Sequence, residues 1–264
     1  MLSVTIITHN EAHNLPDALA SVAWADEIVV VDSESTDQTV EIARAAGARV
    51  IIHPWPGYAE QKNFAETQAS HPWILNLDAD ERVTPELKAL IGQAIKAATP
   101  THQAFYVRRR NCYLGRWLRH SGWYPDYQLR LYQRGSGQWR GEFVHESFYP
   151  HQRAGYLEAD LLHYSIRSLT EHHERLGRYT TLAAQRLKAE GKRVSIRHIA
   201  LLPALTFFKS YVLKLGVLDG LAGLYVSYFA AYYVFLKYAK RWEDQRNERR
   251  GDVASRQFKT VSGK

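Results

Sequence analysis

Residues 73–78 read WILNLD, and residues 84–95, which follow after a short acidic turn, read TPELKALIGQAI. The first stretch is an apolar run of strand length. The second has the apolar spacing of a helix, with a threonine cap and a proline at its first position. Three carboxylates, Asp78, Asp80 and Glu81, lie between them. The pattern predicts a strand that enters a helix through a polar edge.

The same order recurs on the N-terminal side. The apolar runs LSVTIIT (2–8), EIVVVD (27–32) and ARVII (48–52) each precede a helix-like pattern. Strands that are apolar on both faces and alternate with helices are typical of a parallel sheet with helices on both sides. Residues 1–100 are therefore predicted to form an α/β domain, in which ligands bind beyond the carboxyl ends of the strands.

Residues 101–165 have a different pattern of short strands joined by Gly, Pro and aromatic loops, for example LEADLLHYS (157–165). We expect them to extend the same sheet, so that the first domain covers residues 1–165. A helical, membrane-associating region is expected over residues 166–250, and a basic, disordered tail over residues 251–264.

The charge is concentrated at the C-terminus. Residues 237–264 hold nine Lys or Arg against four Asp or Glu, so nine minus four accounts for five of the seven net positive charges. The rest of the chain is close to neutral, which argues against nucleic acid as a partner and favours a basic segment near an anionic surface. The single cysteine, Cys112, excludes an intrachain disulfide, and no secretory signal pattern begins the sequence, so we expect a cytoplasmic location.

Residues 198–239 are rich in aromatic side chains. They contain the uncharged run GLAGLYVSYFAAYYVFL (220–236), which at 17 residues is at the lower limit for crossing a bilayer. Abundant tyrosine and basic flanks favour a pair of helices lying in the membrane surface. A transmembrane helix and a buried core or dimer helix are the two alternatives.

Polar side chains follow three of the predicted strands. Alternate residues of an extended segment point the same way, so Asp78 and Asp80 are predicted to converge on a hard cation, Mg²⁺ or Mn²⁺, that leaves positions open for phosphates. Asp32 ends another strand, where an acid can accept hydrogen bonds from a base or ribose. The alternative in each case is a solvated turn or a helix cap. The remaining candidates at these strand ends are Thr8, Asn10, Glu11, Ser33 and Ser35.

Four motifs, in their order and spacing, resemble those of family 2 glycosyltransferases with the GT-A fold. The resemblance implies a nucleotide-diphosphate sugar, usually a UDP-sugar, held by Asp32 and Glu11 with Lys62 near it. It also implies a metal on the D-x-D acids and inversion at the sugar. The motifs are VTIITHNEAHNL (4–15), VVVDSESTDQT (29–39), QKNFA (61–65) and LNLDADE (75–81).

Later segments look like the lipopolysaccharide inner-core β-glycosyltransferases that add glucose to a core heptose. The resemblance implies that residues 101–165 receive a lipid-linked saccharide acceptor and that the enzyme lies on the cytoplasmic face of the inner membrane. A polyprenyl-phosphate glycosyltransferase and a non-catalytic sugar-nucleotide or membrane scaffold protein are the alternatives. The segments are YPDYQLRLYQRGSGQWRGEFVHESF (124–148), LLHYS (161–165) and KSYVLKLGVLDGLAGLYVSYFAAYYVFLKY (209–238).

Inversion requires a base for the acceptor hydroxyl. Glu146 and Asp126 are the candidates, and Glu146 is favoured because it lies later in the chain. His145 is expected to orient the acceptor and His163 to complete the metal or diphosphate site, with a packed histidine as the alternative for both. Arg130 is expected to meet acceptor phosphates, although a solvated strand face is an equal alternative.

Overall fold

The computed structural model describes residues 1–97, 102–141 and 146–261. The chain divides into two compact units, which are taken separately below. The first unit contains Met1–Tyr113 and Trp123–Ser165, and the second contains Leu114–Gly122 and Ile166–Lys264.

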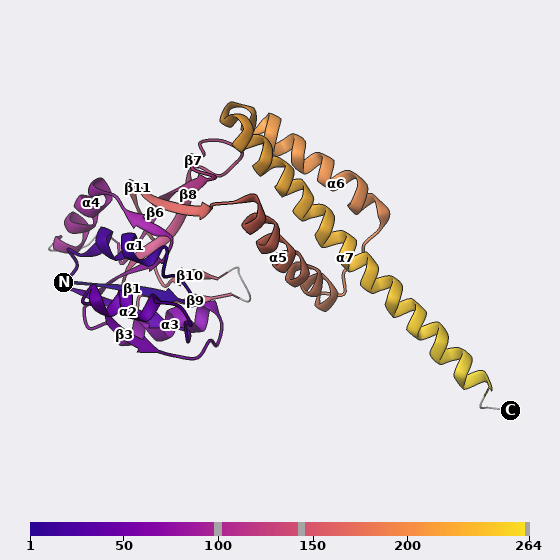
Figure 1. Cartoon of the computed structure of the whole chain (residues 1–264), viewed down its shortest axis with the longest axis horizontal. Helices are drawn as coiled ribbons and strands as arrows, with labels where there is room; N and C mark the ends of the chain where they lie inside the picture. The colour runs from indigo at the N-terminus through magenta and orange to yellow at the C-terminus, as the bar shows by residue number, and fades with distance from the viewer. Residues whose placement is uncertain (98–101, 142–145, 262–264) are drawn as a thin grey trace. The chain divides into compact units, whose positions relative to one another are not determined.

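The first unit is built on one mixed sheet, of which several strands are labelled in Figure 1. The strand order is β3-β2-β1-β4-β8-β6-β11-β5. The first four of these strands are parallel, whereas β4–β8, β8–β6 and β11–β5 are antiparallel pairs. Strands β6 and β8 follow each other without a crossover helix, which is typical of antiparallel neighbours. A separate hairpin is formed by β9 and β10. The strands are β1 (Leu2–Thr8), β2 (Glu27–Asp32), β3 (Arg49–Ile52), β4 (Trp73–Asp78), β5 (Glu81–Val83), β6 (Ala104–Tyr113), β8 (Asp126–Gln133), β9 (Gly137–Arg140), β10 (Ser147–Pro150) and β11 (Gly155–Ile166).

Helices cover both faces of the parallel half, which confirms the α/β prediction. Val30 of β2 shares a core with Leu15 of α1, whereas its neighbours Val29 and Val31 pack with Ala65 of α3, because successive strand residues point to opposite faces. The helices are α1 (Leu15–Val22), α2 (Thr39–Ala45), α3 (Tyr58–Gln68) and α4 (Pro85–Lys96).

Local signals mark the start of α4 and the end of α2. The Thr84 side chain caps α4 by accepting a hydrogen bond from the Leu87 N–H at 3.2 Å. Gly47, just beyond α2, has φ +79°, a backbone conformation that favours glycine. Local sequence therefore sets where these helices begin and end.

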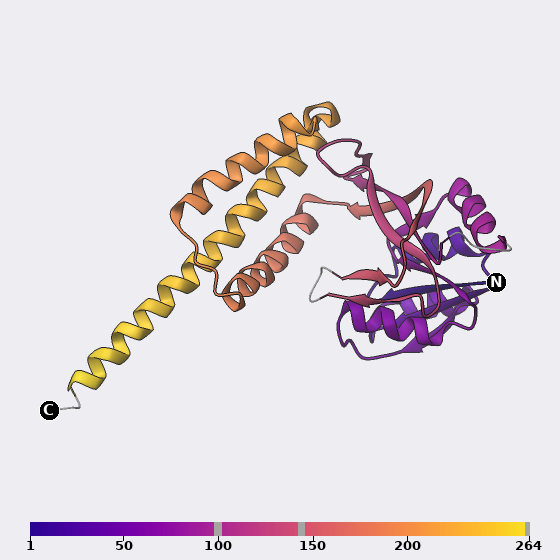
Figure 2. The same cartoon turned by 180° about the vertical axis from the view of Figure 1, so that it is seen from behind.

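The second unit is mainly helical. In Figures 1 and 2, α6 and α7 lie side by side and α5 packs along α7. The ring of His172 on α5 stacks on Phe229 of α7 at 3.9 Å between centroids, and the Lys240 ammonium on α7 donates to the Gly177 carbonyl at 2.8 Å. The elements are β7 (Arg116–Trp117), α5 (Leu169–Ala189), α6 (Ile196–Phe208), the π-helical turn η1 (Lys209–Leu213), the 3₁₀ turn η2 (Gly216–Asp219) and α7 (Gly220–Val261).

Two features bear on the predicted C-terminal region. By length and composition alone, the segments Ile196–Leu213 and Gly216–Glu248 are each able to cross a membrane, and only 6% of the first and 28% of the second is buried. Such low burial argues against the buried-core alternative for α6. Helix α7 continues to Val261.

Candidate active site

Three parallel strands end at one level of the sheet. The register places Thr8 of β1 beside Asp32 of β2, and Ile7 of β1 beside Asp78 of β4. The polar residues that follow these strands therefore gather along one edge, as expected for ligand sites in parallel sheets.

Asp32 organises the edge at β1 and β2. Its carboxylate is fully buried and accepts hydrogen bonds from the Thr8 hydroxyl at 2.8 Å, the Ser35 hydroxyl at 2.5 Å and the Ser35 N–H at 2.8 Å. The Asn10 N–H in turn donates to the Ser35 oxygen at 2.8 Å. Ser33 accepts from the Gln61 amide at 3.0 Å. Hydrogen bonds among these predicted nucleotide-binding residues thus join the loop after β1 to the loop after β2.

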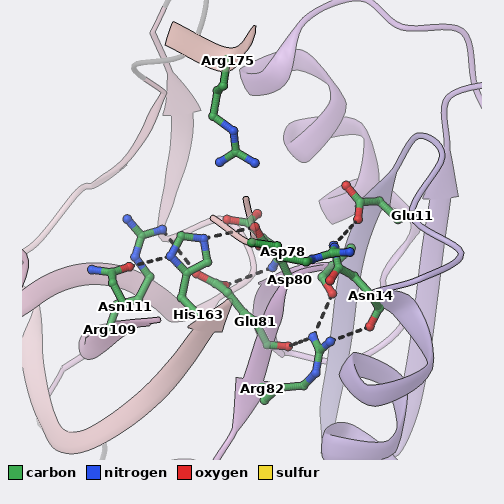
Figure 3. Close-up of polar contacts among 12 residues, drawn as sticks. Glu11, Asn14, Asp78, Asp80, Glu81, Arg82, Arg109, Asn111, His163 and Arg175 are labelled. Atoms are coloured by element: carbon green, nitrogen blue, oxygen red, sulfur yellow. Dashed lines mark hydrogen bonds and ion pairs between the residues drawn. The ribbon is translucent and has the colours of Figure 1, made fainter. Parts of the chain in front are cut away.

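Glu11 lies at the entrance to α1. Its carboxylate accepts from the Asn14 side-chain amide at 2.7 Å, and its backbone N–H donates to the Thr39 hydroxyl at 2.8 Å (Figure 3). The second contact ties the loop after β1 to the beginning of α2. Glu11 is thereby held beside the Asp32 loop.

Asp78 and Asp80 have different partners. Asp78 is paired with the Lys62 ammonium at 3.1 Å and with Arg130, whereas Asp80 pairs with His163 Nε2 at 3.1 Å. The strand ends at Asp78 and the chain turns at Ala79, so strand alternation does not govern the two side chains. Across the described part of the chain, no group of three His, Cys, Asp or Glu side chains forms a ready metal cluster.

The geometry of His163 nevertheless fits a cation beside Asp80. The Asn111 amide nitrogen donates to the Trp123 carbonyl at 2.9 Å, so the Asn111 oxygen faces His163 Nδ1, 2.5 Å away, and Nδ1 must carry the proton (Figure 3). Nε2 lies 3.1 Å from the Asp80 carboxylate. An imidazole nitrogen and a carboxylate side by side are ligand types that would suit a divalent cation, with other positions left for phosphate oxygens and water.

Lys62 links Asp78 to Glu146. Its ammonium lies 3.1 Å from a Glu146 oxygen as well as 3.1 Å from Asp78, and 4.5 Å from the centre of the Trp139 ring. The Lys62 side chain is only 2% exposed, whereas its partners Asp78 and Glu146 are 28% and 16% exposed, so the ammonium is shielded from water and the carboxylates face the solvent side. Glu146, predicted as the base, is therefore brought to the end of β4 by a residue 84 positions earlier in the chain.

A network of charges surrounds these residues. The Arg130 guanidinium, 4% exposed, pairs with Asp78 and lies 2.7 Å from the fully buried Glu81. Burial opposes ionisation of Asp78, but Arg130 and Lys62 outweigh it and hold the pKa of Asp78 well below its usual range. The Asp78 carboxylate is therefore kept ionised by two buried cations.

Asp126 is connected to this network through Arg109. Arg109 pairs with it at 2.7 Å and with Glu81 at 3.5 Å. Although burial raises the pKa of Asp126, Arg109 and hydrogen bonds from Gln128 and Asn111 lower it below its ordinary value. The Asp126 carboxylate is therefore held ionised against Arg109.

A pocket of about 490 Å³ opens beside Glu146. It has acidic and basic side chains together with four aromatic rings, a composition suited to a polar ring that stacks and hydrogen-bonds. Asp126 is not among the residues that line it. The lining residues are Asp78, Tyr106, Arg109, Tyr127, Gln128, Leu129, Arg130, Trp139, Glu146, Ser147 and Phe148.

The two residues predicted to bind the acceptor, Arg130 and His145, have different outcomes. Arg130 lines this pocket but is buried between two carboxylates rather than on a solvated face. Its buried Nε–H has no hydrogen-bond partner among the described residues. His145 lies outside the described residues. Its role stays a prediction.

Sequence reasoning missed two residues that position the acidic turn. Asn111 sets the proton of His163, and Arg82 donates to the carbonyls of Ala79 at 2.9 Å and Asn14 at 2.7 Å, which fastens the turn to α1 (Figure 3). Neither residue has a motif of its own. Their roles depend on strands that meet only in the folded chain.

Replacing Arg130 by methionine is expected to destabilise the fold by about 3–5 kcal/mol, because the fully buried Glu81 and the half-buried Asp78 lose their shared cation. Denaturant unfolding would measure the change. Arg108→Met is the matched control: Arg108 pairs with Asp160 at 2.7 Å but is 28% exposed, so its loss should cost under about 1 kcal/mol. Equal losses for the two variants would show that burial does not decide the effect.

Comparison with known proteins identifies the family. Residues 3–164 match the model of Glycosyl transferase family 2. The chain is 33% identical to the lipopolysaccharide core biosynthesis glycosyltransferase LpsC of Rhizobium meliloti over 92% of each chain, and 33% identical to an uncharacterized glycosyltransferase of Rickettsia bellii over 90% of this chain and 85% of the other.

A solved structure is also similar over a shorter stretch. Glucosyl-3-phosphoglycerate synthase of Mycobacterium tuberculosis, in complex with Mn²⁺, UDP-glucose and phosphoglyceric acid, is 26% identical and covers 42% of this chain and 44% of its own, with a TM-score of 0.37. The family model spans the acidic turn and the whole mixed sheet, and the similarity to LpsC continues through the C-terminal helices. The chain is accordingly a glycosyltransferase of family 2 with a GT-A-like fold, and it resembles enzymes of lipopolysaccharide core biosynthesis.

Proposed function

We propose that this enzyme transfers a hexose, glucose in the first instance, from a UDP-sugar to a lipid-linked saccharide, the heptose of the lipopolysaccharide inner core, with inversion. The observation that carries the proposal is the Glu146 carboxylate, held by Lys62 beside Asp78 at the wall of the pocket. The similarity to LpsC over 92% of the chain supports the class of acceptor.

The nucleotide end of the donor would lie along the edge formed by β1 and β2. The Asp32 loop offers hydroxyl and backbone groups from Thr8, Ser33 and Ser35, and Asn10 and Glu11 border it. The Asp32 carboxylate already accepts three hydrogen bonds inside the loop and so holds the shape of the loop. It would also accept a hydrogen bond from the nucleotide base. The sugar end would then point toward Asp78 and Lys62.

The diphosphate would lie near Asp80 and His163. A divalent cation held there, Mg²⁺ or Mn²⁺, would supply positive charge to the departing UDP. Asn111 keeps the His163 ring oriented for this role, and Lys62 adds a second positive charge on the other side of Asp78. A role for Asp78 as a direct metal ligand stays a prediction.

The transfer itself needs one proton to leave the acceptor. Glu146 would accept the proton of the acceptor hydroxyl as that oxygen forms a bond to the anomeric carbon and the bond to the UDP oxygen breaks. Lys62 would hold the base in place, and Arg130 would donate to the acceptor from the pocket wall. The aromatic rings of the pocket would exclude water from the reacting atoms.

The helical second unit would keep the enzyme on the cytoplasmic face of the inner membrane, where a lipid-linked acceptor is found. Its α6 helix is long, apolar and mostly unburied. Peripheral attachment brings the active site to an acceptor that cannot leave the bilayer.

A donor screen tests the proposal. UDP release would be measured with UDP-glucose, UDP-galactose and other nucleotide sugars, with and without Mn²⁺ and a heptose-containing lipid acceptor. We expect release that depends on both the acceptor and one UDP-hexose. Transfer to polyprenyl phosphate instead would support the polyprenyl-phosphate alternative, and binding without turnover would support a scaffold.

Replacing Asn111 by leucine is expected to weaken metal binding by about 10- to 100-fold, because His163 loses the acceptor that orients its ring. Mn²⁺ titration in the presence of UDP would measure the affinity directly. Asn63→Leu is the control, since the Asn63 amide bonds the backbone of Trp139 and makes two contacts of 2.9 Å there. Unchanged Mn²⁺ affinity in Asn111→Leu would separate His163 from the metal.

A further inference from the structure

The turn that joins α6 to α7 is apolar outside and polar inside. Leu213, Leu215, Val217, Leu218 and Leu221 expose between 50% and 68% of their surfaces. A turn between helices in water usually shows the opposite pattern. Residues 212–221 are called the apolar turn below.

The polar side chains of this region are directed inward and bonded. Ser210, Asp219 and Ser227 are all less than 9% exposed, and the Ser227 hydroxyl donates to the Ser210 oxygen at 2.9 Å. An exposed apolar patch over a bonded polar interior marks an interaction surface.

The loop 114–122 holds the apolar turn in this conformation. The Asp219 carboxylate accepts from the backbone N–H groups of Arg119 at 3.2 Å and His120 at 2.8 Å, and the Ser121 N–H donates to the Lys214 carbonyl at 2.8 Å. A Cβ added at Gly223 would lie 1.9 Å from the Gly216 carbonyl oxygen, so the turn is also closely packed. The exposed leucines are therefore presented by a fixed scaffold.

Four basic side chains surround the apolar turn. Lys214 comes from the turn itself, Lys209 from the start of η1 just before it, and Arg116 and Arg119 from the loop 114–122; all four are exposed. The only acidic residue in the segments 114–122 and 209–221 is Asp219, which is buried and bonded. We call these four residues the basic collar.

We propose that the apolar turn and the basic collar form a docking surface for the anionic face of a lipid bilayer. The leucines enter the interfacial region, and the collar contacts headgroup phosphates. The proposal rests on the membrane attachment included in the proposed function, but not on the identity of the donor or acceptor. The proposal assigns the membrane contact to the turn between α6 and α7 rather than to the whole helical unit.

Chain connectivity supports docking rather than spanning. The loop 114–122 leaves β6 and returns to β8, so the apolar turn that it holds must stay on the same side of the membrane as the sheet. If α6 crossed the bilayer from that turn, α5 would have to cross back. Helix α5, LTEHHERLGRYTTLAAQRLKA, carries charged residues in both its first and its last turns and in between at Glu174, Arg175 and Arg178, which is incompatible with a bilayer core.

The charge of the collar favours a bilayer over a second copy of the chain. A two-fold contact between two apolar turns would bring two collars together, eight cations with no exposed acid from these segments. Anionic headgroups match both the cations and the leucines. The occupant is therefore lipid.

Flotation with phosphatidylcholine vesicles, with and without phosphatidylglycerol, tests the proposal. Leu213→Asp/Leu218→Asp is expected to lower binding to the anionic vesicles about tenfold or more, because two inserted side chains become charged. Ile196→Asp is the matched control: Ile196 is 74% exposed at the other end of α6, in its first turn, where an acid suits the helix. It should change binding less than about twofold.

A second variant tests the collar and does not alter the apolar turn. Lys209→Gln/Arg119→Gln should lose about fivefold in affinity per charge on anionic vesicles and nothing on neutral ones. Because both side chains are exposed, this variant decides the question even where the leucine variant fails to fold.

Four outcomes are distinguishable. Unchanged flotation of both double variants would overturn the proposal. If Ile196→Asp lost as much vesicle binding as Leu213→Asp/Leu218→Asp, the whole of α6 rather than the apolar turn would be the membrane contact. A dimer seen by light scattering that only the leucine variant disrupts, with flotation unchanged, would assign the surface to a second copy. UDP affinity measured by calorimetry should be normal in every variant, so a failed donor-site assignment would show itself separately.

Discussion

Asp80→Ala is expected to lower turnover by about three orders of magnitude while the fold stays intact. The carboxylate pairs with His163 at the end of the acidic turn, and together they form the site that we assign to the divalent cation. Charge stabilisation of a leaving diphosphate by a metal is worth several kcal/mol, and each 1.36 kcal/mol is a factor of about ten in rate. The kcat would be measured with Mn²⁺ over a concentration series, beside Mn²⁺ affinity in the presence of UDP.

Asp17→Ala is the control for this variant. Asp17 pairs with Arg82 at 3.6 Å but its side chain is 81% exposed, so its loss should change neither turnover nor metal affinity. A thermal melt would confirm that both variants are folded. Full activity of Asp80→Ala in EDTA would contradict the metal assignment.

Glu146→Gln is expected to lower kcat by about 10²- to 10⁴-fold with UDP-sugar affinity nearly unchanged. The amide keeps a hydrogen bond to Lys62 and fills the same space, but it cannot accept the acceptor proton. Because the group acts on the acceptor, donor binding measured by calorimetry should be preserved. A residue that only binds the acceptor would instead raise the acceptor KM.

Asp126→Asn is the matched comparison. Arg109 lowers the pKa of Asp126, and Asp126 does not line the pocket, so we expect most of kcat to remain. Steady-state kinetics of the two variants, with folding checked by circular dichroism, would separate the roles. The reverse pattern would transfer the base to Asp126.

The sequence also anticipated much of the edge at which these residues lie. Thr8, Asp32 and Asp78 each follow an apolar run, and parallel strands bring their carboxyl ends to the same side of a sheet. The motif order therefore predicted both the α/β domain and the gathering of polar groups beyond β1, β2 and β4. These are local signals, because strand and helix periodicity are properties of a few neighbouring residues.

The second half of the sheet was less predictable. Short strands without crossover helices leave the pairing order open, so the sequence did not indicate that β11 pairs with β5 and places His163 beside Glu81. That register is what brings His163 to Asp80, 83 residues away. The predicted convergence of Asp78 with Asp80 assumed a continuous strand, whereas the chain turns at Ala79.

The sequence by itself determined the α/β class, the strand ends that carry the polar residues, and the apolar character of the C-terminal helices. Only the tertiary structure decided which charges meet: Lys62 between Asp78 and Glu146, Arg130 between Asp78 and Glu81, and Asp219 against the loop 114–122. The physical reason is range. Periodicity and capping act over a few residues, whereas an ion pair depends on the register of strands and helices that are tens of residues apart and is formed only when the chain has folded.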